Sequence, residues 1–218
     1  MKVFHCSCEN HPSLFFENTT CTYCGRLTGY SEYLHQVIAF DEGPAEKIYT
    51  CPEDPRGFYR RCQNNEAYGV CNGMVRCNSA SEREPANYCF ACQFNKEIPD
   101  LSVSNHISLW KKLEHAKRRT LYTLTALNLP VPNSQEDPQR GLSFSFLADK
   151  LADDHFNTPL KNHNPVFTGH DNGEITINLA EADDVARTKT RLAMGEQYRT
   201  LLGHFRHETG HFYWDRLV

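Results

Sequence analysis

The chain has 218 residues, 39% of them apolar and 23% charged, which is ordinary for a globular protein of one or two domains. Its net charge of −4 and its pI near 6.2 argue against a general nucleic-acid or membrane-surface binder. The sequence contains neither an apolar run long enough to span a membrane nor an apolar secretory segment, so we expect a cytoplasmic protein.

All ten cysteines lie in the N-terminal part of the chain, the last of them at Cys92. Two pairs, Cys21-x-x-Cys24 and Cys89-x-x-Cys92, have the spacing of zinc knuckles, in which two thiolates lie on a tight turn. In a reducing compartment, metal binding accounts for such pairs better than disulfides do. Each knuckle then needs two further ligands to complete a tetrahedral zinc site.

Partners for the first knuckle precede it in the chain. Cys6 and Cys8 are the obvious donors, although a Cys-x-Cys spacing is tighter than the usual gap. His5 or His11 could therefore replace one thiolate. We favour four cysteines as the ligands of a first structural zinc: Cys6, Cys8, Cys21 and Cys24.

Partners for the second knuckle are less determined. Four cysteines lie between the two knuckles, and spacing alone does not choose two of them: Cys51, Cys62, Cys71 and Cys77. The two that remain are expected to be packed as small apolar side chains, because a free cysteine is more often buried than reactive.

The segment around Pro99 is expected to join two parts of the chain, a cysteine-rich part over residues 1–98 and a helix and strand part over residues 99–218. Ser104 is the candidate N-cap of a helix that runs to about Leu127. The residues available for its buried face are Ile107, Trp110, Leu113, Leu121 and Leu124.

Basic residues are frequent on the same helix: Lys111, Lys112, Lys117, Arg118 and Arg119. We interpret them as a solvated face rather than as a binding site for an acidic partner. Glu114 is interspersed among them, and no aromatic ladder accompanies the charges.

Two strands are predicted after a proline-rich loop that starts at Asn128. The first reads LSFSFLAD and alternates apolar and polar residues. The second, from Gly173 to Leu179, is either a plain sheet strand or an edge strand that holds an extended peptide. Glu181, Asp183 and Asp184 suit the first turn of the next helix. Three histidines in polar, loop-like sequence are expected to be surface groups and receive no site role: His155, His163 and His170.

The sequence YRTLLGHFRHETGHFYWDRLV predicts a helix with a His-Glu-x-x-His pattern. His207 and His211 are one turn apart on one side of this helix and could bind one zinc ion, which leaves a position open for water. Glu208 would take the proton of that water during attack on a peptide carbonyl. The alternative is a pair of histidines on a solvated or structurally bonded helix face. The expected buried stripe is Tyr198, Leu201, Leu202, Phe205, Thr209 and Phe212.

Several segments together resemble bacterial zinc-binding metallopeptidases with an N-terminal zinc ribbon: the knuckles, FYRRCQNNEAYGVCN, YCFACQFNKEIPDLS, WKKLEHAKRRTLYTL and the segment with the histidine pair. The resemblance covers most of the chain. It implies that a second structural zinc is held by Cys62, Cys71, Cys89 and Cys92, and that Cys51 and Cys77 lie outside both sites. It also implies a third, acidic ligand of the catalytic zinc downstream of residue 218, so the catalytic zinc is expected to be weakly bound or absent in this chain.

We therefore predict an α+β protein in which a zinc-ribbon module with two zinc ions, residues 1–98, precedes a zincin-like half-domain, residues 99–218. The predicted function is zinc-dependent hydrolysis of a peptide or protein substrate, with Glu208 as the general base and with His207 and His211 on a catalytic zinc. The alternative is a non-catalytic zinc-ribbon module that binds protein or nucleic acid and carries an incomplete histidine site.

Overall fold

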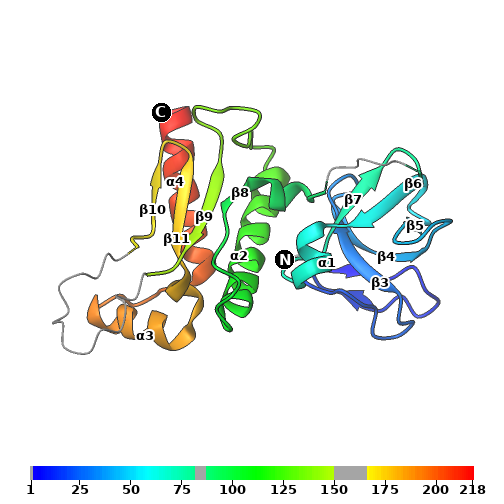
Figure 1. Ribbon diagram of the computed structural model, residues 1–218, viewed down its shortest axis with the longest axis horizontal. Helices are drawn as coiled ribbons and strands as arrows, with labels where there is room; N and C mark the ends of the chain where they lie inside the picture. Colours follow the sequence, from blue (N-terminus) through cyan, green and yellow to red (C-terminus); the bar gives the residue numbers. More distant parts are fainter. Residues whose placement is uncertain (1, 82–86, 150–165) are drawn as a thin grey trace. The chain divides into compact units, whose positions relative to one another are not determined.

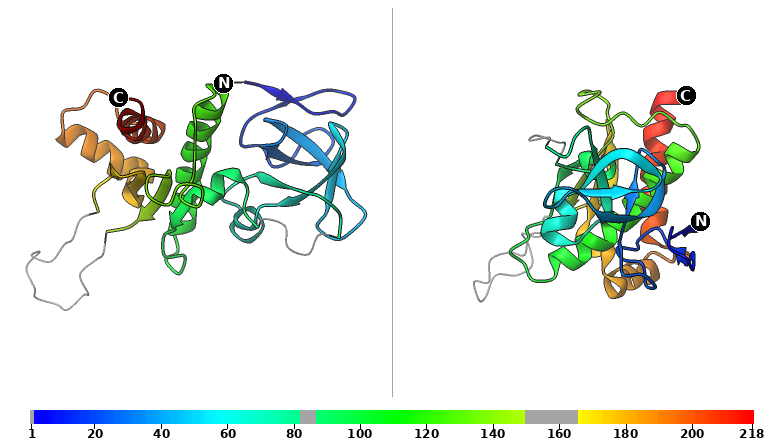
Figure 2. Two further views of the ribbon diagram at one scale, coloured as in Figure 1. Left: turned by 90° about the horizontal axis from the view of Figure 1, so that it is seen from above. Right: turned by 90° about the vertical axis from the view of Figure 1, so that its right-hand side faces the viewer.

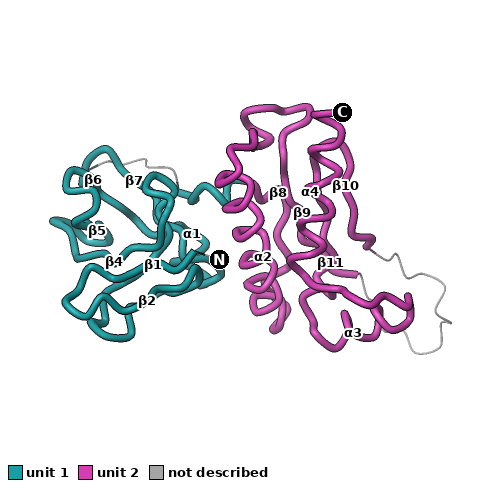
Figure 3. Tube along the Cα trace, turned by 180° about the vertical axis from the view of Figure 1, so that it is seen from behind, with its two compact units in different colours: residues 1–93 teal, residues 94–218 magenta. Residues whose placement is uncertain are grey.

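The computed structural model describes residues 2–81, 87–149 and 166–218 (Figure 1). The chain forms two compact units, Met1–Gln93 and Phe94–Val218 (Figure 3). The division falls a few residues before the expected junction at residue 98, because Asn95–Glu97 pairs with a strand of the second unit. The mixed α+β class is confirmed, with cysteine clusters in the first unit and a helix and strand region in the second.

The first unit begins with a small hairpin in which β1, Phe4–His5, pairs antiparallel with β2, Ser13–Leu14. Phe16 follows β2 and packs on the ring of Tyr30 at a centroid distance of 5.1 Å. The side-chain amide of Asn72 donates to the carbonyls of Phe16 and Asn18 at 2.9 and 2.8 Å. These contacts attach the hairpin segment to the barrel beside it (Figure 2).

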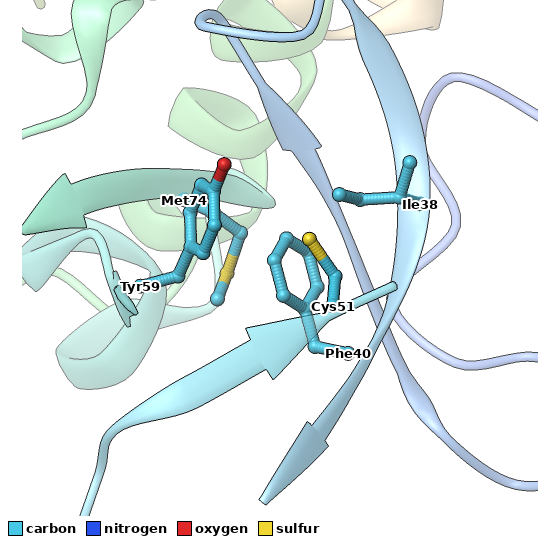
Figure 4. Packing of buried hydrophobic residues seen from close by; sticks show 5 residues of the cluster. All are labelled: Ile38, Phe40, Cys51, Tyr59 and Met74. Atoms are coloured by element: carbon cyan, nitrogen blue, oxygen red, sulfur yellow. The ribbon is translucent and has the colours of Figure 1, made fainter. Parts of the chain in front are cut away.

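Five strands of the first unit form a closed barrel: β3 Leu27–Ser31, β4 Gln36–Glu42, β5 Tyr49–Cys51, β6 Asp54–Arg61 and β7 Gly73–Cys77. Neighbouring strands are antiparallel except β3 and β7, which close the barrel in parallel. The core contains Ile38, Phe40, Cys51, Tyr59 and Met74 (Figure 4). Cys77 is buried as well. Cys51 and Cys77, the two cysteines that belong to neither proposed zinc site, are therefore packed as expected.

The second unit contains a four-stranded sheet in the order β10-β11-β9-β8. Its strands are β8 Asn95–Glu97, β9 Ser143–Leu147, β10 Gly169–Asp171 and β11 Glu174–Asn178. The central strand β9 is parallel to both neighbours, and β10 is antiparallel to β11. The second predicted strand is therefore not at an edge, because β10 pairs with it on the outer side and forms the edge instead.

Two helices cover one face of this sheet. The ring of Phe205 on α4, Leu201–Leu217, lies 5.6 Å from Phe144 and 6.3 Å from Phe146 of β9. Lys117 on α2, His106–Ala126, lies over the same two rings. Since residues two apart on a strand face the same side, α2 and α4 pack on the same face of β9. The remaining helical segments are α1 Gln63–Tyr68, α3 Asp184–Ala193, and the 3-10 turns Phe90–Phe94 and Leu179–Ala182.

Helix α2 differs from its prediction at the start and on its charged face. Asn105, not Ser104, occupies the N-cap position, because a backbone hydrogen bond from His106 to Val103 closes the preceding turn. The solvated-face interpretation is wrong for Lys117 and for Arg118, whose exposed fractions are 0% and 3%.

A buried ion pair explains the position of Lys117. Its Nζ lies 2.8 Å from a carboxylate oxygen of Glu114, and both side chains are fully buried. Glu114 also accepts from Trp110 Nε1 at 3.0 Å and from Asn95 Nδ2 at 2.8 Å. These partners offset the cost of burying the two charges.

Helix α3 begins close to its predicted start, but Glu181 lies in the preceding 3-10 turn and Asp183 is the N-cap. The Asp183 carboxylate accepts from the backbone amides of Val185 and Ala186, and Asp184 occupies the first turn. Among the described residues, no helix has the length and apolar character needed to cross a membrane.

Candidate metal centres

The first site brings together the sulfurs of Cys6, Cys8, Cys21 and Cys24, all within 4.8 Å of one another. The Sγ atoms of Cys6 and Cys24 are 3.7 Å apart. A tetrahedral zinc site with Zn–S bonds of about 2.3 Å has sulfur–sulfur edges of about 3.8 Å. The spacing therefore fits four thiolate ligands of one zinc ion.

Local backbone hydrogen bonds place these sulfurs. The amide of Cys6, just after β1, donates to Pro12 O at 3.0 Å, and the knuckle closes through Gly25 N to Cys21 O at 3.0 Å. Gly25 has a φ of 73°, which a glycine adopts without strain. The ring nitrogen Nδ1 of His11 contacts the Cys6 carbonyl, and that of His5 contacts the His11 carbonyl.

The first site is partly open and has a cation beside it. Cys24 is exposed, and Arg26 Nε donates to its sulfur at 3.4 Å. This hydrogen bond lowers the pKa of the Cys24 thiol to about 6. Burial instead raises the pKa of Cys6 to about 12. The site therefore contains one thiol that ionises readily and one that needs a cation to do so.

The second site brings together Cys62, Cys71, Cys89 and Cys92, the set that the family resemblance implied. All four are buried, their sulfurs lie within 4.8 Å of one another, and Cys71 and Cys92 are 3.8 Å apart. Hydrogen bonding to the neighbouring thiol of Cys62 raises the pKa of Cys71, because four crowded thiols cannot all ionise without a cation. The spacing again equals the edge of a zinc tetrahedron.

The connection between β6 and β7 shapes the second site. Cys62 directly follows β6, and helix α1 ends at Gly69 in the left-handed conformation, which returns the chain to Cys71. At Gly73 an added Cβ would lie 2.3 Å from the Cys89 sulfur, so only glycine allows this close approach. All ten cysteines are free thiols, which leaves both sets available to a metal.

The histidine pair lies on α4, whose first turn is capped by the Thr200 hydroxyl accepting from Gly203 N at 3.1 Å. The Nε2 atoms of His207 and His211 are 3.1 Å apart. Two imidazoles on one tetrahedral zinc, with Zn–N bonds of about 2.0–2.1 Å, are separated by about 3.3 Å. The pair therefore has the spacing of two ligands of one ion.

Helix α4 buries three of the six residues of the stripe expected from its sequence, and Leu201 and Leu202 are half-buried. Phe205, Thr209 and Phe212 are buried, and Glu208 is only 8% exposed. Tyr198 was wrongly included in this stripe, since the helix begins at Leu201 and the Tyr198 side chain is 80% exposed.

A cavity of about 660 Å³ adjoins the histidine pair at His207. His204, His207 and Glu208 line it from α4, and Glu181 and Arg199 line it from the preceding segments. A basic, an acidic and a metal-binding side chain thus face one space that is large enough for part of a peptide.

Ion pairs hold the wall of this cavity. Arg199 donates to both carboxylate oxygens of Glu181, at 2.5 and 3.3 Å, and to Glu196. Glu181 Oε2, which accepts from Arg199 Nε, also lies 3.8 Å from His204 Nε2. Burial lowers the pKa of His204, although the nearby Glu181 opposes this shift. His204 therefore presents a neutral imidazole near neutral pH.

His170 was wrongly assigned to exposed loop sequence. It lies in β10 with its side chain 6% exposed, and its ring stacks on His211 at a centroid distance of 6.4 Å. Its Nε2 accepts from Gly173 N at 3.0 Å, so its proton is on Nδ1, 3.9 Å from the Asp215 carboxylate. His155 and His163 lie outside the described residues.

The histidine pair has fewer ligands than the cysteine sites. Within residues 2–81, 87–149 and 166–218, three or more metal-binding side chains converge only at the two cysteine sets. His207 and His211 supply two ligands, whereas a catalytic zinc usually has three from the protein.

Comparison with known proteins assigns the two parts of the chain. Residues 106–218 match the family described as "Putative zinc-binding metallo-peptidase", and residues 3–103 match a zinc-ribbon domain. The chain therefore belongs to this zinc-binding metallo-peptidase family, with an N-terminal zinc ribbon.

Relatives in mycobacteria extend over the whole chain. Uncharacterized proteins of Mycobacterium bovis and Mycobacterium tuberculosis are 35% identical to it over 221 residues. The alignment covers 100% of this chain and 54% of each relative, so the chain spans about half the length of these proteins. No solved structure matches the chain significantly.

Proposed function

We propose that the protein is a zinc-dependent peptidase whose histidine pair holds the catalytic metal. The observation that carries this proposal is the 3.1 Å separation of the His207 and His211 Nε2 atoms, beside a buried Glu208 that lines the adjoining cavity. When bound there, zinc would polarise a peptide carbonyl and favour the ionisation of water.

The side chains around the pair have distinct proposed roles. Glu208 accepts the proton of the attacking water and passes it to the departing amine, because its carboxylate faces the cavity while its helix is fixed by buried neighbours. The substrate is an extended peptide that pairs with the edge strand β10. His170 of β10 stacks on His211, so this edge runs beside the histidine pair.

The two cysteine sites have a structural role in this proposal. Four thiolates fill a tetrahedral shell and leave no open position for water or substrate. The ten free thiols also fit a reducing compartment, and we include a cytoplasmic location in the proposal.

A non-catalytic zinc-ribbon module is the second candidate. The observation that favours it is the unequal completeness of the sites, with four ligands at each cysteine set and two imidazoles on α4. On the peptidase proposal, an acidic side chain that the described residues do not bring to the pair supplies a third ligand. The affinity of the histidine pair for zinc in this chain is then expected to be well below that of the cysteine sites.

The test is Glu208→Gln, with the exposed Glu97→Gln as a control that makes the same chemical change in the same unit. Zinc content and hydrolysis of a mixed peptide library are measured on the same preparations at saturating zinc. We expect Glu208→Gln to keep its zinc while turnover falls by about 100-fold or more, and Glu97→Gln to match the wild type. Unchanged turnover in Glu208→Gln would exclude Glu208 as the general base. A wild-type chain with three bound zinc ions and no hydrolysis favours the non-catalytic module.

A further inference from the structure

Arg26 contacts four residues around the first cysteine site. It follows the knuckle by two residues, and its Nε donates to Cys24 Sγ at 3.4 Å. Its Nη2 donates to Cys6 Sγ at 3.5 Å and to the Ser7 hydroxyl at 3.1 Å. Its Nη1 lies 3.3 Å from both carboxylate oxygens of Asp41 on β4. One guanidinium thus contacts the two halves of the site and a strand of the barrel.

The charge of a four-thiolate zinc site explains how these contacts would stabilise it. Zinc with four thiolates has a net charge of −2, and a neighbouring cation reduces the cost of holding that charge in the protein. A guanidinium is always protonated and presents several N–H groups in a fixed plane, so it can donate to two sulfurs at once. Cys6 comes from the hairpin and Cys24 from the knuckle, so Arg26 also fixes these two segments relative to each other.

The link to Asp41 extends this arrangement to the barrel. The Arg26 side chain is 22% exposed, whereas that of Asp41 is 50% exposed. The ion pair is therefore partly screened by water and contributes little attraction by itself. Its geometric effect is to hold the guanidinium in contact with the sulfurs of Cys6 and Cys24.

We propose that Arg26 is a positioning residue for the zinc of the first site, and that retention of this zinc depends on its hydrogen bonds to Cys6 and Cys24. The inference rests on zinc binding at the first site and does not depend on peptide hydrolysis.

The experiment measures zinc retention at each site separately. The zinc-loaded chain is mixed with a chelator and N-ethylmaleimide, and mass spectrometry follows the alkylation of each cysteine with time. Arg26→Gln is compared with Arg56→Gln, which removes the same charge from an exposed position on β6. Arg26→Lys retains the charge but loses the planar set of donors.

We expect Arg26→Gln to increase the alkylation rate of Cys6, Cys8, Cys21 and Cys24 by about 10- to 100-fold, which is the usual effect of losing a partner of a metal ligand. The rates at the second site should stay at the wild-type value, and Arg26→Lys should fall between wild type and Arg26→Gln. Arg56→Gln should behave as the wild type.

Three outcomes would overturn the proposal. One is an unchanged rate at the first site of Arg26→Gln. Another is an equal increase at both sites, since that indicates general unfolding rather than a local role. The third is an equal effect of Arg56→Gln, which indicates a dependence on overall charge. Rapid alkylation of the first site in the wild type without chelator would instead show that this site holds no zinc. That result would contradict zinc binding at the first site, on which the proposal for Arg26 rests.

Discussion

The two units of the chain are stabilised by different means. The first has short strands, a small barrel core and two sets of four cysteine sulfurs at zinc-ligand spacing. The second has a sheet covered by two helices and a fully buried ion pair between Glu114 and Lys117. We therefore expect metal ligation to contribute much of the folding free energy of the first unit, whereas the second unit relies on core packing.

Removal of zinc should produce the largest difference in stability between the two units. Structural zinc sites in small domains contribute about 10 kcal/mol or more to folding, so a strong chelator should unfold the first unit. The second unit should remain folded because its core is independent of the cysteines. Both tryptophans, Trp110 and Trp214, belong to the second unit, and their fluorescence therefore reports on that unit alone.

Hydrogen exchange measured by mass spectrometry reports on the folding of residues 1–93, which contain no tryptophan. We expect two zinc ions per chain before chelation, then rapid exchange in this region together with unchanged tryptophan fluorescence. Continued protection of the first unit after complete zinc removal would contradict a folding role for the metals. A parallel change in fluorescence would show that the units do not fold independently.

The buried ion pair provides the corresponding test of the second unit. Lys117→Met leaves the carboxylate of Glu114 buried without its cation, and such changes cost about 3–5 kcal/mol. The measurement is the free energy of unfolding from denaturant titrations followed by tryptophan fluorescence. Zinc retention in the first unit should not change.

Lys112→Met is the matched control on the same helix. The Lys112 side chain is 48% exposed and pairs with Asp184 at 3.0 Å, so its loss should cost no more than about 1 kcal/mol. Equal effects of the two variants would show that burial does not determine the strength of this pair. The double variant Lys117→Met with Glu114→Leu should regain part of the lost stability, because neither charge then remains buried.

The sequence identified the metal-binding residues better than the barrel. Fixed Cys-x-x-Cys and His-x-x-x-His spacings reflect local geometry and predict the pairs within each site. The choice of Cys62 and Cys71 for the second site came from the family resemblance and not from spacing, and the structure brings the four sulfurs together. The closure of β3 onto β7 depends on pairing between segments distant in the chain, with Tyr30 opposite Gly73. Local alternation of apolar residues contains no information on such pairing.

The errors in the second unit have two physical origins. Lys117 and Arg118 were placed in solvent because charge predicts exposure, whereas the acceptors that make burial of Lys117 possible come partly from Asn95, far away in sequence. His170 was missed although a local feature was present. Asn172 and Gly173 have φ values of 48° and 94°, and an Asn-Gly pair between apolar segments is a strong indication of a hairpin. That hairpin would have placed His170 in the edge strand.

The smallest expected effect is a dependence of the second unit on pH through His204. Burial lowers the pKa of this imidazole below the ordinary value of 6.5, so the folded state binds its proton less readily than the unfolded state. The contribution to stability is therefore fully present above about pH 6.5 and decreases as the pH falls toward the folded pKa. The unfolding free energy of the second unit, followed by tryptophan fluorescence without added zinc, should decrease less steeply over this range in His204→Gln than in the wild type. The first unit is not observed by this signal, so titration of its thiols does not interfere. Equal slopes in the two proteins would show that the His204 pKa is the same in the folded and unfolded states.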